Sequence, residues 1–154
     1  MNRRQTRIPR QWLITDERLG PNLDRALRAL PSGSGVVVRD ARLRRRVRRL
    51  VAGRHIAVTL EGRGVARVHD TREIRDAQLR GARLLLLSPL FPTRSHPDRR
   101  PLPRMRVAAL LRLTRVPVIA LGGMNRRRFR RVQALGFVGW AGIDAWLKVT
   151  NVTR

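Results

Sequence analysis

The feature that most constrains the fold is a regular alternation between short apolar runs and segments with apolar residues at helical spacing. Parallel strands buried on both faces appear as continuous apolar runs, and they are joined through crossover helices. The alternation therefore predicts an α/β protein with a parallel sheet. The apolar runs cover 12–15, 36–38, 55–60, 65–68, 84–87, 116–121 and 137–141, and the helical segments cover 22–30, 41–52, 71–80, 104–113 and 126–135.

The alternation breaks at one place. Only Glu61-Gly62-Arg63-Gly64 separates the run at 55–60 from the run at 65–68. A crossover between parallel strands needs a dozen residues or more, so this segment cannot hold a helix. Either the two strands form a hairpin or one βα unit has been lost, and in both cases we expect a tight turn over 61–64.

The length of 154 residues predicts a single domain over 1–154, whose basic N-terminus at 1–10 we expect to be disordered. The chain has no cysteine, which excludes disulfides, thiolate metal sites and cysteine nucleophiles. No apolar run approaches the roughly 20 residues that span a membrane. The N-terminus also lacks the apolar stretch of a secretory signal. We therefore expect a cytoplasmic protein with no membrane partner.

The net charge of +25 comes almost entirely from arginine and has two interpretations. One is nucleic-acid binding, in which basic side chains contact phosphates. The other is a preference for arginine on ordinary helix surfaces. The arginines are spread over most of the chain, and aromatic residues make up only 4% of it, which leaves few platforms for stacking on bases. Nucleic acid is therefore an unlikely partner, and a charge map with one dense stripe would be needed to support it.

Two glycine motifs and one loop predict a phosphate site. Gly122-Gly123 lies between an apolar run and a helix, where glycines let a phosphate approach the backbone and the helix presents free N–H groups. Gly142-Ile143 follows the next strand. The alternative is that these are ordinary tight-turn glycines. The loop 88–97 combines three prolines with Ser88, Thr93, Arg94, Ser95 and His96 as hydrogen-bond donors, although it could also be a plain surface loop.

Three stretches, in this order and at this spacing, resemble the thiamine phosphate synthase and TenI (thiazole tautomerase) superfamily. They are Leu87–Pro97, Pro117–Met124 and Gly136–Ile143, and Val68–Glu73 is similar to the family's V-H-S-x-x-E. The resemblance implies a TIM-type (β/α) barrel with its phosphate site in the loops after the last strands. A complete barrel typically needs about 250 residues. We therefore expect a shortened or incomplete barrel of about seven strands.

The resemblance also implies a function. Thiamine phosphate synthases join hydroxymethylpyrimidine diphosphate to thiazole phosphate and release pyrophosphate, with Mg²⁺ and basic groups on the leaving diphosphate. The substrates would thus be small phosphorylated molecules and the cofactor Mg²⁺. Carried onto this sequence, Arg39 and His96 face the diphosphate as catalytic groups. The substrate- and phosphate-binding set is Ser88, Thr93, Arg94, Ser95, Gly122, Gly123, Gly142 and Ile143.

The departures from the family lie in the half that binds the pyrimidine diphosphate. Val37 stands where the family has Gln, and both carboxylate motifs for Mg²⁺ are missing, so no metal ligand is assigned. Arg39 and Arg94 could partly replace a metal on the diphosphate.

His69 matches the acid/base histidine of thiazole tautomerases, although it could equally cap the following helix. A tautomerase or a non-catalytic binding paralogue therefore stays open beside the synthase. Because an incomplete barrel leaves strand edges unpaired, we also expect a homodimer.

Overall fold

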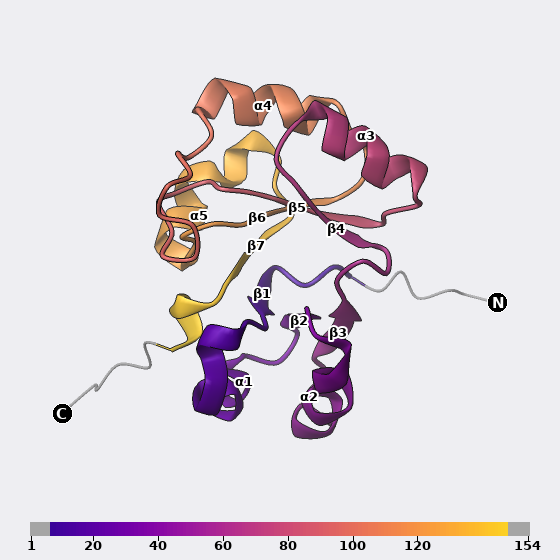
Figure 1. Ribbon diagram of the computed structural model, residues 1–154, viewed down its shortest axis with the longest axis vertical. Coiled ribbons are helices and arrows are strands. Elements are labelled where there is room, and N and C mark those ends of the chain that lie inside the picture. The colour runs from indigo at the N-terminus through magenta and orange to yellow at the C-terminus, as the bar shows by residue number, and fades with distance from the viewer. Residues whose placement is uncertain (1–6, 148–154) are drawn as a thin grey trace.

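The computed structural model describes residues 7–147. Seven parallel strands, in the order β3-β2-β1-β7-β6-β5-β4, curl into a nearly closed barrel with the helices on its outside (Figure 1). This confirms the predicted fold class and the expected number of strands. The strands are β1 (Gln11–Ile14), β2 (Gly35–Val38), β3 (Ala57–Leu60), β4 (Val65–Val68), β5 (Leu84–Leu87), β6 (Val118–Ala120) and β7 (Gly139–Gly142).

The helices follow the strands as the sequence predicts. Four of them are short 3-10 helices that lead into or continue other elements. None of the helices described is long and apolar enough to cross a membrane. The α-helices are α1 (Leu23–Ala29), α2 (Arg44–Leu50), α3 (Thr71–Leu79), α4 (Arg104–Arg112) and α5 (Arg126–Val132), and the 3-10 helices are η1 (Glu17–Asn22), η2 (Ala41–Leu43), η3 (Gln133–Leu135) and η4 (Asp144–Trp146).

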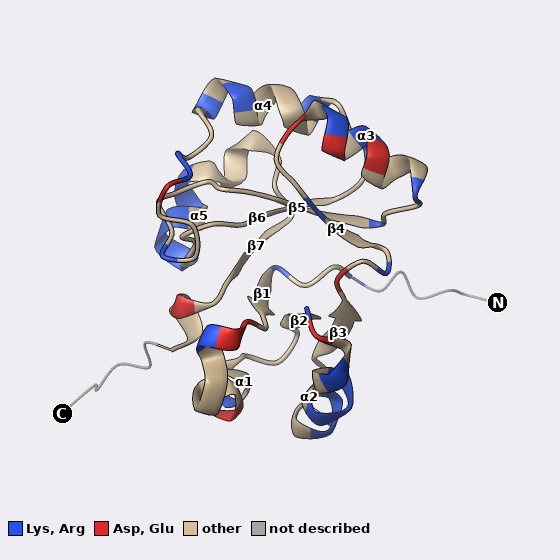
Figure 2. Cartoon of the chain, viewed as in Figure 1, with Lys and Arg blue, Asp and Glu red and all other residues tan. Residues whose placement is uncertain are grey.

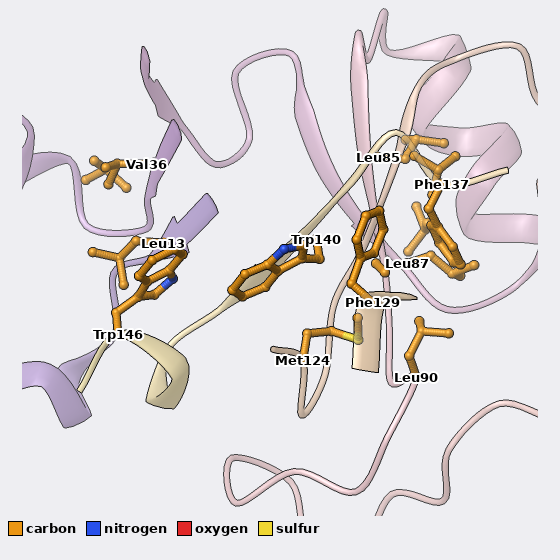
Figure 3. Packing of buried hydrophobic residues seen from close by; sticks show 14 of the residues in the cluster. Leu13, Val36, Leu85, Leu87, Leu90, Met124, Phe129, Phe137, Trp140 and Trp146 are labelled. Atoms are coloured by element: carbon orange, nitrogen blue, oxygen red, sulfur yellow. The ribbon is translucent and has the colours of Figure 1, made fainter. Parts of the chain in front are cut away.

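Alternate side chains of each strand enter two apolar layers, because successive residues of a strand point to opposite faces. The outer layer packs against the helices, and Trp140 stacks on Trp146 there with ring centroids 5.3 Å apart. Figure 3 shows Trp140 between Trp146 and Leu13 on one side and Phe129 on the other. The inner layer fills the barrel and consists of Trp12, Ile14, Val37, Val65, Leu84, Leu86, Ile119, Leu121 and Ala141.

The segment from Glu61 to Gly64 forms the tight turn that the sequence predicts. The N–H of Gly62 donates to the oxygen of Val65 at 2.9 Å, and the N–H of Arg63 donates to the oxygen of Leu60 at 3.1 Å. β3 and β4 lie at opposite ends of the sheet order and meet only at a parallel bridge between Glu61 and Val65. The hairpin alternative is therefore wrong, and the connection instead lacks a βα unit.

The N-terminal stretch that we expected to be disordered lies partly outside the described residues, which begin at Arg7. Its last two residues contact the barrel. The oxygen of Pro9 accepts from the Trp12 indole at 2.7 Å, and the oxygen of Arg10 accepts from the N–H of Trp140 at 2.9 Å. These contacts fix the chain where it enters β1 beside β7.

Candidate active site

A cavity of about 720 Å³ opens at the carboxyl ends of the strands. The loops after β1, β2, β4, β5, β6 and β7 contribute to its wall, which is the position that binding sites take in β/α barrels. All eleven residues that the sequence predicts for the site line this one cavity. They are Arg39, His69, Ser88, Thr93, Arg94, Ser95, His96, Gly122, Gly123, Gly142 and Ile143.

The loop after β5 lies directly on the loop after β6. The N–H of Leu90 donates to the oxygen of Leu121 at 3.0 Å, and the N–H of Phe91 donates to the oxygen of Gly122 at 3.1 Å. A Cβ on Gly123 would lie 2.3 Å from the oxygen of Pro92, and one on Gly122 would lie 2.8 Å from Pro89 Cα. The missing side chains of the two glycines thus make room for this loop, and their role beside a phosphate stays a prediction.

The backbone of the loop after β6 still offers donors to a ligand. In the described part of the chain, the N–H groups of Gly123 and Met124 have no protein acceptor. The side chain of Asn125 caps α5 by accepting from the N–H of Arg128 at 2.8 Å. A Cβ on Gly142 would lie 3.0 Å from the oxygen of Met124, so the end of β7 adjoins this loop. The two glycine motifs are therefore neighbours in space, as the sequence predicts.

A chain of ion pairs runs along the opposite wall, from β4 to the loop after β1. Glu61 lies between two guanidinium groups, with Oε1 3.3 Å from Arg67 Nε and Oε2 3.3 Å from Arg39 Nε. Arg39 Nη1 also lies 3.0 Å from Asp16 Oδ2, and Asp16 Oδ1 lies 3.3 Å from Arg18 Nε. We call these five residues the ion-pair chain. It links β4, the turn after β3, the loop after β2 and the loop after β1, and so connects both sides of the β3–β4 junction.

Burial and the neighbouring opposite charges shift the pKa values of Arg67 and Asp16 in opposite directions. Burial lowers the pKa of the Arg67 guanidinium, against the charge of Glu61, which raises it. Partial burial raises the pKa of Asp16, but the hydrogen bonds and charge of Arg18, with the charge of Arg39, outweigh it and hold that pKa below its ordinary value of 3.8. Asp16 is therefore ionised at neutral pH, and both Asp16 and Glu61 are paired with arginine.

Arg18 extends the ion-pair chain across the mouth of the cavity. Its Nη2 donates to Ser95 Oγ at 2.6 Å, and its Nη1 lies 3.6 Å from Asp144 Oδ1. The sequence motifs did not indicate Arg18 or Arg67 as site residues, and they placed Glu61 only in the predicted turn. Arg67 carried a signal that could have identified it, because a charged residue at an inward position of a buried strand needs a partner or a ligand.

His69 lies at the end of β4, lines the cavity and also contacts α3. Its Nδ1 is 2.8 Å from Glu73 Oε2, and its backbone N–H donates to the same oxygen at 2.6 Å. Asp70 caps α3 by accepting from the N–H of Glu73 at 2.9 Å. His69 therefore lines the cavity while its Nδ1 is held at the start of the helix, and its acid/base role stays a prediction. A carboxylate on Nδ1 fixes the orientation of the ring and leaves Nε2 for proton transfer.

The residues present do not fit a Mg²⁺ site. Within residues 7–147, no three His, Asp or Glu side chains come together as metal ligands. Asp16 and Asp144 line the cavity, but both are ion-paired with Arg18. Mg²⁺ requires oxygen ligands that are free to coordinate it, and Glu61 is occupied by Arg39 and Arg67 in the same way.

The basic side chains elsewhere are distributed over several elements. Figure 2 shows Lys and Arg positions on several helices, namely α2, α3, α4 and α5. A nucleic-acid surface gathers its basic residues on one face or along one helix. The spread over several elements therefore does not favour the nucleic-acid alternative.

Loops after the last two strands of a β/α barrel, at the carboxyl ends, are where phosphate-binding barrels frequently build their sites, and here these loops carry glycines beside an arginine-lined cavity. Residues 44–146 match the thiamine monophosphate synthase family, and the chain belongs to that family. This confirms the superfamily that the sequence motifs indicate.

Related proteins agree with this family. A thiamine-phosphate synthase of Pyrococcus furiosus is 29% identical over 89 residues, which is 58% of this chain and 43% of the relative. One of Syntrophomonas wolfei is 28% identical over 86 residues, or 55% of this chain and 41% of the relative. The matched stretch thus spans less than half the length of these curated relatives.

The solved structure of thiamine phosphate pyrophosphorylase from Pyrococcus furiosus superposes with a TM-score of 0.73. The superposition covers 91% of this chain and 88% of that one, at 20% sequence identity. At this level of identity the likeness establishes the fold alone.

Proposed function

We propose that this chain binds thiazole phosphate in the cavity and acts in thiamine biosynthesis as a thiamine phosphate synthase-like protein with a weakened diphosphate half-site. The observation that carries the proposal is the convergence of the loops after β5, β6 and β7 on one cavity. Unpaired N–H groups of Gly123 and Met124 adjoin Gly142 there, and the hydroxyls of Thr93 and Ser95 line the same wall. Backbone N–H groups with hydroxyls and guanidinium groups are suited to phosphate oxygens.

The coupling reaction forms a bond between the thiazole nitrogen and the methylene carbon of the pyrimidine. The bond from that carbon to the diphosphate oxygen breaks, and pyrophosphate leaves with the electron pair. Catalysis therefore requires positive charge at the leaving group. On the wall where the family places the diphosphate, Arg39 and Arg67 share the charge of Glu61, and Arg39 also pairs with Asp16. We expect coupling to be slow for that reason.

The test measures binding and coupling separately. Calorimetric titration with thiazole phosphate should give a specific heat of binding. Incubation with hydroxymethylpyrimidine diphosphate and thiazole phosphate should then give little thiamine phosphate, with or without Mg²⁺. Absence of thiazole-phosphate binding would refute the proposal. Rapid Mg²⁺-dependent coupling would instead show that Asp16 or Glu61 leaves its arginine partner to hold the metal.

The pair formed by His69 and Glu73 favours a second candidate, a thiazole tautomerase. In this reaction the His69 ring would remove a proton from one position of the thiazole and return it to another, with no net change in redox state. The 2.8 Å contact between Nδ1 and Glu73 orients the ring for such a transfer.

Exchange of thiazole hydrogens for deuterium, followed by NMR, tests the second candidate. His69→Gln should abolish the exchange while thiazole-phosphate binding persists, and Glu73→Gln should slow it. If the native chain catalyses neither coupling nor exchange, the protein is a binding paralogue. Arg39→Ala cannot separate the candidates, because it also unpairs Asp16 and Glu61. Arg39→Lys keeps the charge and is the better probe.

A further inference from the structure

We propose that the cavity binds a diphosphate group through arginine side chains alone, without a divalent cation, on the rim formed by the loop after β5 and the first turn of α5. We call this surface the arginine rim. The proposal deepens the proposed function, on which it rests for the position of the ligand, by naming the anion that this site recognises. The arginine rim consists of Arg94, Arg99, Arg126, Arg127 and Arg128, which all line the cavity.

The first argument is the distribution of charge around the cavity. On the wall of the ion-pair chain, Arg18, Arg39 and Arg67 face Asp16, Glu61 and Asp144, so the charges balance.

The arginine rim has no such balance. Among the described residues, none of its five guanidinium groups forms an ion pair with a carboxylate. Asp98 is the carboxylate of the same loop, but it does not line the cavity. The field that attracts an anion therefore originates at the rim and not at the opposite wall.

The second argument is that the loops after β5 and β6 hold part of the arginine rim in place. The Arg128 guanidinium lies over the Phe91 ring at 5.1 Å from its centroid, and its Nη1 donates to the oxygen of Gly123. Arg131 lies over the same ring at 5.7 Å. Phe91 comes from the loop after β5 and Arg128 from α5, so these contacts fix Arg128 at the seam between the loops. A guanidinium group held in this way loses less entropy when it binds an anion.

The third argument concerns the size of the anion. A guanidinium group can donate two parallel hydrogen bonds to neighbouring oxygens. A diphosphate carries more terminal oxygens and more charge than a monophosphate, so it can engage several rim arginines at once. The rim thus favours a diphosphate, whereas the N–H groups of Gly123 and Met124 can serve a single phosphate.

The effect of added Mg²⁺ on pyrophosphate affinity tests the proposal, because a metal-dependent site and an arginine site predict opposite changes. A metal-dependent site binds pyrophosphate more tightly when Mg²⁺ is added, because the ion bridges oxygens and carboxylates. Arginines alone compete with Mg²⁺ for the same oxygens, since the metal neutralises pyrophosphate in solution. Added Mg²⁺ should therefore weaken binding to this chain.

The experiment is calorimetric titration of the full chain with inorganic pyrophosphate and, separately, inorganic phosphate, first in EDTA and then in excess Mg²⁺. In EDTA we expect pyrophosphate to bind at least about tenfold more tightly than phosphate, which corresponds to one added charge-assisted contact. Arg94→Gln and Arg127→Gln should each weaken pyrophosphate binding several-fold. Both side chains are exposed, and the described residues offer them no ion pair or side-chain hydrogen bond, so the fold should be unaffected.

Arg112→Gln is the matched control, because Arg112 is an exposed arginine at the end of α4 and does not line the cavity. It should leave affinity unchanged. Equal affinities for pyrophosphate and phosphate, tighter binding with Mg²⁺, or equal losses in Arg112→Gln and the rim variants would each overturn the inference.

The same titrations separate this inference from the proposed function. Thiazole-phosphate binding without pyrophosphate binding would refute only the arginine rim. Pyrophosphate binding without thiazole-phosphate binding would support the rim and refute the proposed function.

Discussion

Replacing Glu61 by glutamine should destabilise the fold, because this carboxylate joins the two edges of the incomplete barrel. Glu61 contacts Arg39 and Arg67 at 3.3 Å each, and its side chain is 22% exposed. At an effective dielectric constant of about 20, each pair gains roughly 5 kcal/mol of gross Coulomb energy. Desolvation offsets most of this gain, and solvent screens Arg39, whose side chain is 46% exposed. We expect a net loss of about 2 kcal/mol in the free energy of unfolding.

Thermal and urea denaturation, followed by circular dichroism, measure this loss. A change of about 2 kcal/mol should lower the Tm by about 4–8 °C in a domain of this size. Asp24→Asn is the matched control, since it removes an ion pair with Arg46 on the surface, where the side chains are 35% and 50% exposed. That change should cost about 0.5 kcal/mol or less. Equal stability of Glu61→Gln and the native chain would refute the reasoning and show that Arg39 and Arg67 are adequately solvated without Glu61.

Three further changes test the packing and the charges. Gly35→Ala should cost about 1–3 kcal/mol in urea denaturation, because the new Cβ would lie 2.1 Å from the Trp12 ring, and unchanged stability would mean that the indole can move aside. Gly123→Ala should lower both the Tm and thiazole-phosphate affinity, because its Cβ would lie 2.3 Å from the oxygen of Pro92 at a φ of 58°; an unchanged Tm would contradict the packing found here. The pKa of Asp16 is held below 3.8, so its carboxylate stabilises the fold above that pH and the contribution is lost as the pH falls below it. Asp16→Asn should therefore flatten the fall in unfolding free energy as the pH drops below 3.8, and an unaltered slope would refute the pairing with Arg18 and Arg39.

Most of the strands were predictable because each contains a run of apolar residues, and those of β2 and β5 are buried on both faces. The runs at 65–68 and 84–87 coincide with β4 and β5, whereas the runs at 55–60 and 116–121 are longer than β3 and β6. Pro117 lies just before β6, where its oxygen accepts from the N–H of Leu85. Element boundaries depend on such tertiary hydrogen bonds, which no local pattern contains.

The members of the site could be predicted, but their contacts could not. The motifs located the eleven residues in one cavity because strand ends of a parallel barrel meet at one face. They did not reveal that the glycines at 122 and 123 accommodate Pro89 and Pro92, since that contact joins two loops distant in sequence. The pairing of Glu61 with Arg67 was also beyond prediction, because it depends on how the shortened connection brings β3 and β4 together.

The pairing of β1 with β7 has a consequence for synthesis on the ribosome. The first strand finds its second neighbour only in the last one, and the indole of Trp146 donates to the oxygen of Trp12 across 134 positions of sequence at 3.1 Å. Until Trp140 and Trp146 leave the exit tunnel, the nascent chain can assemble β1–β3 and β4–β6 but cannot join them through β7. The two groups of strands would expose apolar faces until then, and chaperones that recognise such faces would have that interval in which to bind.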